Sequence, residues 1–206
     1  MEKKDLLKDV IKHIDIKSYN STELVDAMRN MSFTSRDTAR AADILMMMCK
    51  EKECTNILTL AGSTSAAGCM QVYVDMVRNK MIDVVVATGA SIIDMDLFEA
   101  LGYKHYIGEK ENVIPDTTLR DLYIDRIYDT YIDEEELQAC DHTTFEIANM
   151  LEARPYSSRE FIYEIGKWLH EGNAVKKDSL IQTCYECGVP IFVPAFSDSS
   201  AGFGIG

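Results

Sequence analysis

Two strand-like segments in tandem each run directly into a loop of glycine and other small residues. Asn56–Leu60 (NILTL) precedes Ala61–Gly68 (AGSTSAAG), and Asp83–Ala87 (DVVVA) precedes Thr88–Ser91 (TGAS). A stretch of helical length separates the two, so the order is strand, loop, helix, strand, loop. Such a βαβ unit is parallel and right-handed. Both loops are therefore expected at the carboxyl edge of one sheet.

The carboxyl edge of a parallel sheet is where α/β proteins bind nucleotides. Free amides and small side chains there let a phosphate approach the backbone and a helix N-terminus. A third strand is predicted at Val189–Ala195, followed by a loop rich in Ser and Gly. Gly62 and Gly68 do not have GxGxxG spacing, and each loop alone would be explained better by tight helix–strand packing. Their repetition predicts a nucleotide or dinucleotide site.

The chain has 206 residues, of which 47% are hydrophobic. This size suits one α/β domain with a sizeable core. We expect a Rossmann-like parallel sheet with helices on both faces, incomplete at the C-terminus. Residues 1–55 are predicted to form a helical arm and residues 56–206 the sheet-forming part of a single domain. The ending GFGIG resembles the start of another βα connection, so we expect further sheet from the same polypeptide or a partner.

The formal net charge of −13 disfavours nucleic acid as a partner, because no basic surface is in prospect. The negative net charge suits a cationic substrate such as a polyamine, although an acidic composition also keeps a protein soluble. No apolar run approaches the roughly 20 residues that span a membrane, and the N-terminus lacks the apolar core of a signal peptide. We therefore expect a cytoplasmic protein with six reduced cysteines and, despite the lone CxxC at Cys184–Cys187, no metal site.

Acidic side chains occur in or directly after two of the predicted strand-end loops. Asp198 lies in the third loop, where it could bind a ribose hydroxyl or an amine, or simply cap a turn. Asp94 and Asp96 follow the second loop, where they could hold an ammonium group or act as acids at a helix N-terminus.

Other residues receive structural interpretations. His105 is predicted to be a packed or hydrogen-bonded histidine, whereas His13, His142 and His170 are expected at the surface. The Met46–Met48 run is interpreted as core packing, residues 108–120 as a loop and Arg126–Tyr131, which alternates polar and apolar residues, as an extended segment. Ser157–Glu160 has capping-box spacing at the start of a predicted helix, and Gly188 is expected to stop the next one, Asp178–Cys187.

The chain resembles the deoxyhypusine synthase family in the order and spacing of several sequence segments. The resemblance is carried by Met31–Leu45, Ala61–Gly68, Met81–Ala90 and Val189–Ser200. Ala100–Gly108 and Arg154–Glu160 are similar to the archaeal and bacterial branch of that family.

The resemblance implies an NAD-dependent transferase with a Rossmann-like sheet, built as a homotetramer. Such an enzyme oxidises and cleaves spermidine and moves its aminobutyl group, by way of an enzyme lysine, onto a lysine of a translation initiation factor precursor. By position in the motifs, the implied NAD contacts are Gly62, Ser63, Thr64, Ser65, Thr88, Gly89, Ala90 and Asp198. Asp94 and Asp96 match the acidic pair, but a spacing shift of one residue leaves open which of them holds the amine.

Two departures from the family pattern keep alternatives open. Phe203 stands where the better-known synthases have an aspartate that meets the amine. The segment that carries the imine-forming lysine would lie beyond Gly206, and no lysine occurs after Lys177. The alternatives are a homospermidine synthase-like transferase, in which a small amine accepts the group, and a truncated, non-catalytic or regulatory subunit of such an enzyme.

Overall fold

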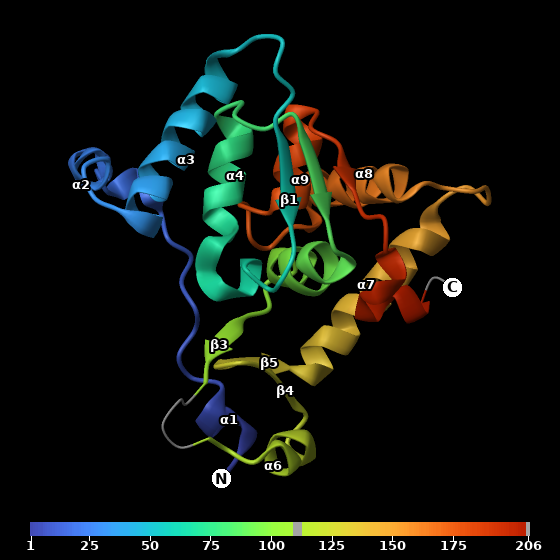
Figure 1. The fold of residues 1–206 in the computed structure, drawn as a ribbon. Coiled ribbons are helices and arrows are strands. Elements are labelled where there is room, and N and C mark those ends of the chain that lie inside the picture. Colours follow the sequence, from blue (N-terminus) through green and yellow to red (C-terminus); the bar gives the residue numbers. More distant parts are fainter. Residues whose placement is uncertain (109–112, 205–206) are drawn as a thin grey trace.

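A three-stranded parallel sheet forms the centre of the chain in this computed structural model, which describes residues 1–108 and 113–204. Its order is β1 (Ile57–Leu60), β2 (Val84–Ala87) and β6 (Ile191–Phe192). Figure 1 shows β1 beside α4 (Met70–Arg78), the helix that follows it in the chain. The α/β class and the parallel sheet are as predicted. Strand β6 is shorter than expected, because Pro190 and Pro194 flank it and proline cannot donate a ladder hydrogen bond.

Three helices bury one face of this sheet. They are α4 (Met70–Arg78), α8 (Ser158–Trp168) and α9 (Leu180–Cys187), and their apolar residues share one core with Leu60, Val85 and Ala87. On the opposite face the side chains of Ile57 and Phe192 are 55% and 38% exposed. The described residues therefore supply helical cover to one face and leave the other largely open.

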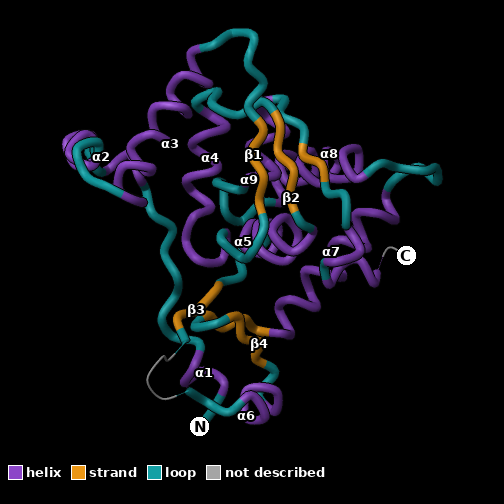
Figure 2. Tube along the Cα trace, in the orientation of Figure 1, coloured by secondary structure: helices purple, strands orange, loops and turns teal. Residues whose placement is uncertain are grey.

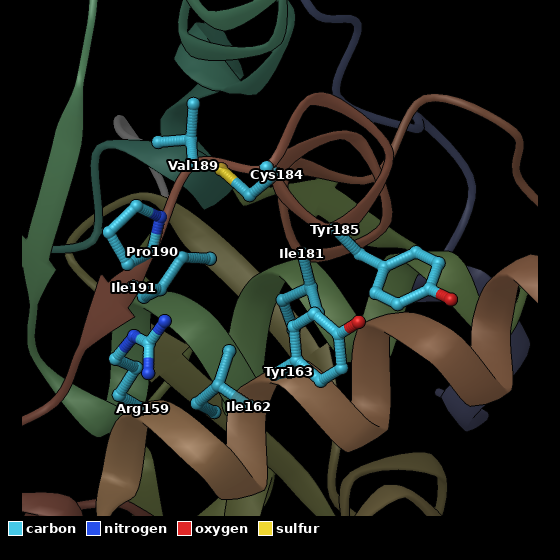
Figure 3. Close-up of a pocket in the computed structure, with 10 residues that line it drawn as sticks. Arg159, Ile162, Tyr163, Ile181, Cys184, Tyr185, Val189, Pro190 and Ile191 are labelled. Carbon is cyan, nitrogen blue, oxygen red and sulfur yellow. The ribbon is translucent and has the colours of Figure 1, made fainter.

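Helices α8 and α9 pack closely because a glycine lies between them. A Cβ atom on Gly166 would come within 2.7 Å of Tyr185 Cβ. The two helices and the start of β6 enclose a small apolar pocket of about 70 Å³, in which the rings of Tyr163 and Tyr185 lie 4.9 Å apart (Figure 3). Its lining is mostly aliphatic and aromatic, so we interpret this pocket as a result of helix packing and not as a catalytic site.

The predicted helix boundaries around α8 and α9 follow from local capping. Ser157 and Glu160 form the predicted capping box at the start of α8. Gly188 ends α9 in the left-handed conformation that favours glycine, at φ +71°. Asp133 caps α7 (Glu134–Met150), whose first turn carries three glutamates as the helix dipole favours.

The N-terminal arm is largely exposed. Helices α2 (Thr22–Met28) and α3 (Phe33–Lys50) pack on each other, and Ala39 is the one fully buried side chain described in α3. Met46 and Met47 are 53% and 60% exposed. The core interpretation of this methionine run is therefore wrong for these two residues, because α3 lies at the periphery of the described chain (Figure 1).

A second, antiparallel sheet departs from the sequence-based expectation. Its order is β3 (His105–Ile107), β5 (Thr130–Asp133) and β4 (Ile124–Ile127), and it has a small core of Leu6, Leu119, Ile124 and Tyr131. Helices α1 (Lys3–Leu6) and α6 (Asp116–Asp121) cover it (Figure 2). The predicted loop 108–120 is thus wrong over α6, and its residues 109–112 lie outside the described part of the chain.

Residues 8–14, which we call the N-terminal strap, join the two sheets. Val10 forms an antiparallel bridge with Tyr106, and the Ile11 amide donates to the His105 carbonyl at 2.9 Å. The strap then continues past the loop that follows β1, where the Ile14 amide donates to the Gly68 carbonyl at 2.9 Å. Its path runs beside β3 in Figure 2.

No helix within the described ranges has both the length and the apolar character that a membrane crossing requires.

Candidate functional site

The loops after the three parallel strands come together at one edge of the sheet, as the sequence predicted. The Thr88 amide donates to the Leu60 carbonyl at 3.2 Å, which joins the ends of β2 and β1. The third loop reaches the second at Gly89, where a Cβ atom would come within 2.7 Å of Ser199 Cβ. Only glycine fits there without moving the third loop.

The first loop has an unusual backbone. Gly62 and Ser63 are both left-handed, at φ +72° and +53°. No neighbouring atom lies within 4 Å of the position that a Gly62 Cβ would take, so the space beside this backbone is open. Further along, Ser65 is only 1% exposed and its Oγ has no hydrogen-bond partner among the described residues. A loop with open space and an unsatisfied buried hydroxyl is suited to receive polar ligand atoms.

The other residues predicted to contact NAD have different local environments. Thr64 Oγ1 accepts from the Tyr73 hydroxyl at 2.8 Å, and Thr88 Oγ1 accepts from the Ser91 amide at 3.2 Å. Ala90 begins the helical segment Ala90–Leu97, which continues as α5 (Phe98–Ala100). Asp198 is exposed within a short helical turn after β6.

Asp94 belongs to a compact acidic group beside the third loop. Ser200 Oγ lies 3.1 Å from Asp94 Oδ1 and 2.7 Å from Asp141 Oδ1, and the Ser200 amide donates to Asp94 Oδ2 at 3.2 Å. Burial raises the pKa of Asp94 to about 6, against the hydrogen bonds from Ser200, and the negative charge of Asp141 adds to the rise. Burial also raises the pKa of Asp141.

One hydroxyl hydrogen cannot satisfy both carboxylates at once. Two neighbouring carboxylates disfavour double ionisation, so a proton on one acid or a cation beside both would stabilise the pair. Asp141 lies on α7 and was missed in the sequence, where it is one of many acids. Only the packing of α7 against the 90–97 segment and the third loop brings it to Asp94.

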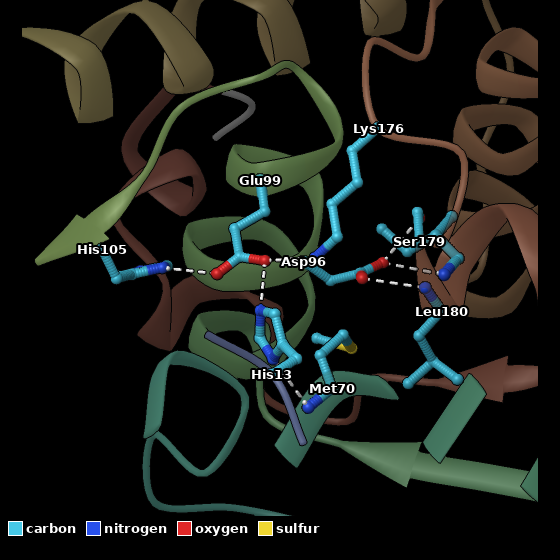
Figure 4. Close-up of polar contacts among 9 residues, drawn as sticks. His13, Met70, Asp96, Glu99, His105, Lys176, Ser179 and Leu180 are labelled. Carbon is cyan, nitrogen blue, oxygen red and sulfur yellow. Dashed lines mark hydrogen bonds and ion pairs between the residues drawn. The ribbon is translucent and has the colours of Figure 1, made fainter. Parts of the chain in front are cut away.

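Asp96 has a different environment from Asp94. It is 1% exposed, and its two oxygens accept from the amides of Leu180 and Ile181 and from the Ser179 hydroxyl, each at 2.8 Å. These donors lie at the N-terminus of α9 (Figure 4). The carboxylate of Asp96 therefore holds α9 to the segment after β2 and is not presented at the open edge.

Glu99 is the centre of a buried charged cluster that the sequence did not reveal. Its oxygens lie 2.9 Å from His105 Nδ1 and 2.6 Å from His13 Nε2, and Lys176 forms an ion pair with it (Figure 4). Burial alone would raise the pKa of Glu99, but the two histidines and Lys176 outweigh it and hold that pKa well below its ordinary value. The predicted hydrogen-bonded role of His105 is confirmed, whereas the surface assignment of His13 is wrong, because its side chain is only 14% exposed.

No cluster of three or more potential metal ligands occurs in the described part of the chain. The six cysteines are all free.

The fold and the site define an α/β protein with three small-residue loops and an acidic pair at one sheet edge. The family model for deoxyhypusine synthase matches residues 23–205. The chain therefore belongs to the deoxyhypusine synthase family.

Curated relatives agree with this assignment. The chain is 67% identical over 204 residues to a deoxyhypusine synthase-like protein of Caulobacter vibrioides, covering 99% of this chain and 55% of the relative. It is 39% identical over 192 residues to a protein of Methanosarcina acetivorans named "Probable deoxyhypusine synthase 2", covering 93% of this chain and 54% of the relative. The chain thus spans about half the length of the curated relatives it matches.

A solved structure supports the fold alone. The crystal structure of an Entamoeba histolytica protein named "putative deoxyhypusine synthase" superposes with a TM-score of 0.62 at 21% identity, covering 95% of this chain and 68% of that one.

Proposed function

We propose that this chain is the cofactor-binding and amine-binding part of a deoxyhypusine synthase-like, NAD-dependent transferase. The observation that carries the proposal is the meeting of three small-residue loops beside the half-buried Asp94–Asp141 pair, in a chain of this family. By the intact polypeptide we mean a chain of the length of the curated relatives that includes these 206 residues. The reaction we assign to it moves an aminobutyl group from spermidine to a lysine of a translation initiation factor precursor.

The residues at the sheet edge fit NAD. The open space beside Gly62 admits a diphosphate close to the backbone, and Ser65 Oγ offers an unused polar atom. Thr88, Gly89 and Ala90 lie at the end of the neighbouring strand, and Asp198 is an exposed acceptor for a ribose hydroxyl. NAD would supply the hydride acceptor for oxidation of the amine. The role of the loops is to bind and orient it.

Asp94 and Asp141 fit the cationic substrate. An ammonium group between them would donate to both carboxylates and remove the competition for the single Ser200 hydrogen. It would also favour ionisation of Asp94, whose pKa burial raises to about 6. We assign amine binding to Asp94 rather than Asp96, since the oxygens of Asp96 are used by α9.

The expected setting is a cytoplasmic homotetramer. The net charge of −13 suits polyamines and a basic acceptor segment and disfavours nucleic acid.

Transfer is tested with the intact polypeptide, NAD and spermidine labelled in its aminobutyl group, with and without the translation factor precursor. Label on the precursor supports the proposed function. Label in homospermidine would instead favour a small-amine acceptor, the alternative raised by Phe203 in the sequence. No transfer and no binding would identify a non-catalytic subunit.

The amine site has its own test. Spermidine binding near pH 6 should release protons from the Asp94–Asp141 pair, seen as a dependence of the calorimetric heat on the ionisation enthalpy of the buffer. Asp94→Asn should weaken spermidine at least tenfold and abolish the proton release, whereas Asp178→Asn, at an exposed ion pair with Arg78, should change neither. Equal proton release in both variants would contradict the assignment.

A further inference from the structure

The N-terminal strap contacts the far end of the first cofactor loop at three successive points. A Gly68 Cβ atom would come within 3.0 Å of the Lys12 carbonyl oxygen, so glycine permits the close approach. The Ile14 amide donates to the Gly68 carbonyl at 2.9 Å. The Met70 amide donates to His13 Nδ1 at 3.2 Å (Figure 4).

The Met70 amide needs a partner from outside its own helix. Gly68, at φ +97°, interrupts the helical backbone, and α4 starts at Met70. The first amides of a helix have no partner within it. The residue before Met70 supplies no side-chain cap, and His13 of the strap accepts this hydrogen bond instead.

The two ring nitrogens of His13 then have distinct roles. Nδ1 accepts from Met70, so the hydrogen of a neutral ring lies on Nε2, 2.6 Å from Glu99 Oε2. Glu99 is held in turn by His105 of β3 and by Lys176. The end of the loop is thereby tied to a cluster formed by distant parts of the chain.

A loop of this shape requires such support. The left-handed backbone of Ser63 costs about 1 kcal/mol or more. Strained backbone persists only where the surroundings hold it.

We propose that His13 is a positioning residue for the NAD site: its Nδ1 hydrogen bond to the Met70 amide holds the first cofactor loop in its binding conformation. The inference rests on the proposed function and adds the strap to the site. His13 acts through the loop and does not touch the cofactor.

Two conservative variants separate the two bonds of the ring. The Oδ1 atom of asparagine lies near the position of a histidine Nδ1, so His13→Asn keeps an acceptor for Met70 and loses the contact with Glu99. The amide of glutamine reaches the position of Nε2, so His13→Gln does the reverse. His170→Ala is the matched control, because His170 also pairs with a glutamate, Glu186, at 2.9 Å but outside the strap.

The experiment measures NAD affinity by calorimetry and amide hydrogen exchange at Met70 in the intact polypeptide. His13→Ala and His13→Gln should weaken NAD about tenfold, the loss of one hydrogen bond in a restrained loop, and should accelerate exchange at Met70. His13→Asn should restore most of the NAD affinity and of the Met70 protection that His13→Ala loses, and His170→Ala should resemble the wild type in both measurements.

The proposal is overturned if His13→Ala leaves NAD affinity unchanged, if exchange at Met70 does not respond, or if His13→Gln rescues and His13→Asn does not. A wild type that does not bind NAD would contradict the proposed function instead. Exchange at Met70 in the same variants would then still decide whether His13 holds the loop.

Discussion

Asp94, Asp96 and Glu99 lie on one short helical stretch, yet each carboxylate has different partners. Asp94 faces another acid across Ser200, Asp96 caps α9, and Glu99 is surrounded by two histidines and a lysine. The direction of each pKa shift and the role of each residue depend on these partners.

The Asp94 carboxyl should give the chain a measurable pH dependence. Its pKa rises from an ordinary value of 3.8 to about 6 in the fold, so the folded state binds the proton more tightly than the unfolded chain. Its contribution is therefore fully present below about pH 4 and is lost as pH rises through about 6. Denaturant unfolding of wild type and Asp94→Asn across this range should show the variant gaining about 2 kcal/mol relative to wild type.

Parallel stability curves for the two proteins would contradict the raised pKa. Glu99, with its lowered pKa, has the opposite sign, because its contribution is lost as pH falls. The difference between wild type and Asp94→Asn cancels the contribution of Glu99, which is present in both, and reports the titration of the Asp94–Asp141 pair.

Removal of the Asp96 carboxylate should destabilise the fold strongly. Asp96→Ala leaves three buried donors without their acceptor, which should lower the free energy of unfolding by about 3 kcal/mol. Asp178→Ala, at an exposed ion pair, should cost less than about 1 kcal/mol. Similar losses in the two variants, measured by urea denaturation, would show that Asp96 does not hold α9 in place.

Residue-level prediction worked where a local pattern carried the information. The spacing of Gly62 and Gly89 after β-rich runs located two of the three loops at the sheet edge. Asp141 and His13 could not be found in this way, because each gains its partners across a long sequence separation. The two possible roles of Asp94 and Asp96 likewise became distinguishable only with α9 in place.

At the scale of elements, the contact between α8 and α9 depends on Gly166. A Cβ atom there would come within 3.0 Å of the Ile181 carbonyl oxygen as well as close to Tyr185, and backbone atoms cannot easily move away. Gly166→Ala should therefore lower the free energy of unfolding by about 2 kcal/mol despite the better helix propensity of alanine. Lys167→Ala, on the exposed side of the same helix, should change it by less than about 0.5 kcal/mol. Thermal unfolding that finds Gly166→Ala neutral or stabilising would contradict the close approach.

The elements with strong end signals were the ones predicted well. The Ser157 capping box and Gly188 gave the ends of α8 and α9. The alternation of polar and apolar residues over Arg126–Tyr131 predicts one extended segment, whereas the structure has the two strands β4 and β5. The turn between them, at Tyr128–Asp129, contains neither the Gly nor the Pro that signals a turn, and Tyr128 adopts a φ of +55°. The short strands of the second sheet have little periodicity, and they are stabilised by pairing that local patterns do not report.

For the molecule as a whole, the parallel sheet retains an open apolar face, and such surfaces favour association. The 206-residue chain should therefore self-associate at micromolar concentration. Ile57→Lys, which places a charge on the exposed side of β1, should reduce the associated fraction, whereas Val175→Lys, also exposed but elsewhere, should have a smaller effect. A stable monomer in light scattering would contradict this expectation. The division into an arm and a sheet-forming part of one domain stays a prediction.

The most direct measurement of the central claim is the affinity of the intact polypeptide for NAD in two matched variants. Gly62 and Gly188 have nearly the same backbone, at φ +72° and +71°, and neither has an atom within 4 Å of its Cβ position. Asp tolerates this conformation better than most residues, so Gly62→Asp and Gly188→Asp should carry similar folding costs. Only the first places a negative charge where we locate the cofactor diphosphate. We predict that Gly62→Asp weakens NAD at least a hundredfold while Gly188→Asp binds like wild type, and equal affinities in the two variants would contradict a cofactor site at this sheet edge.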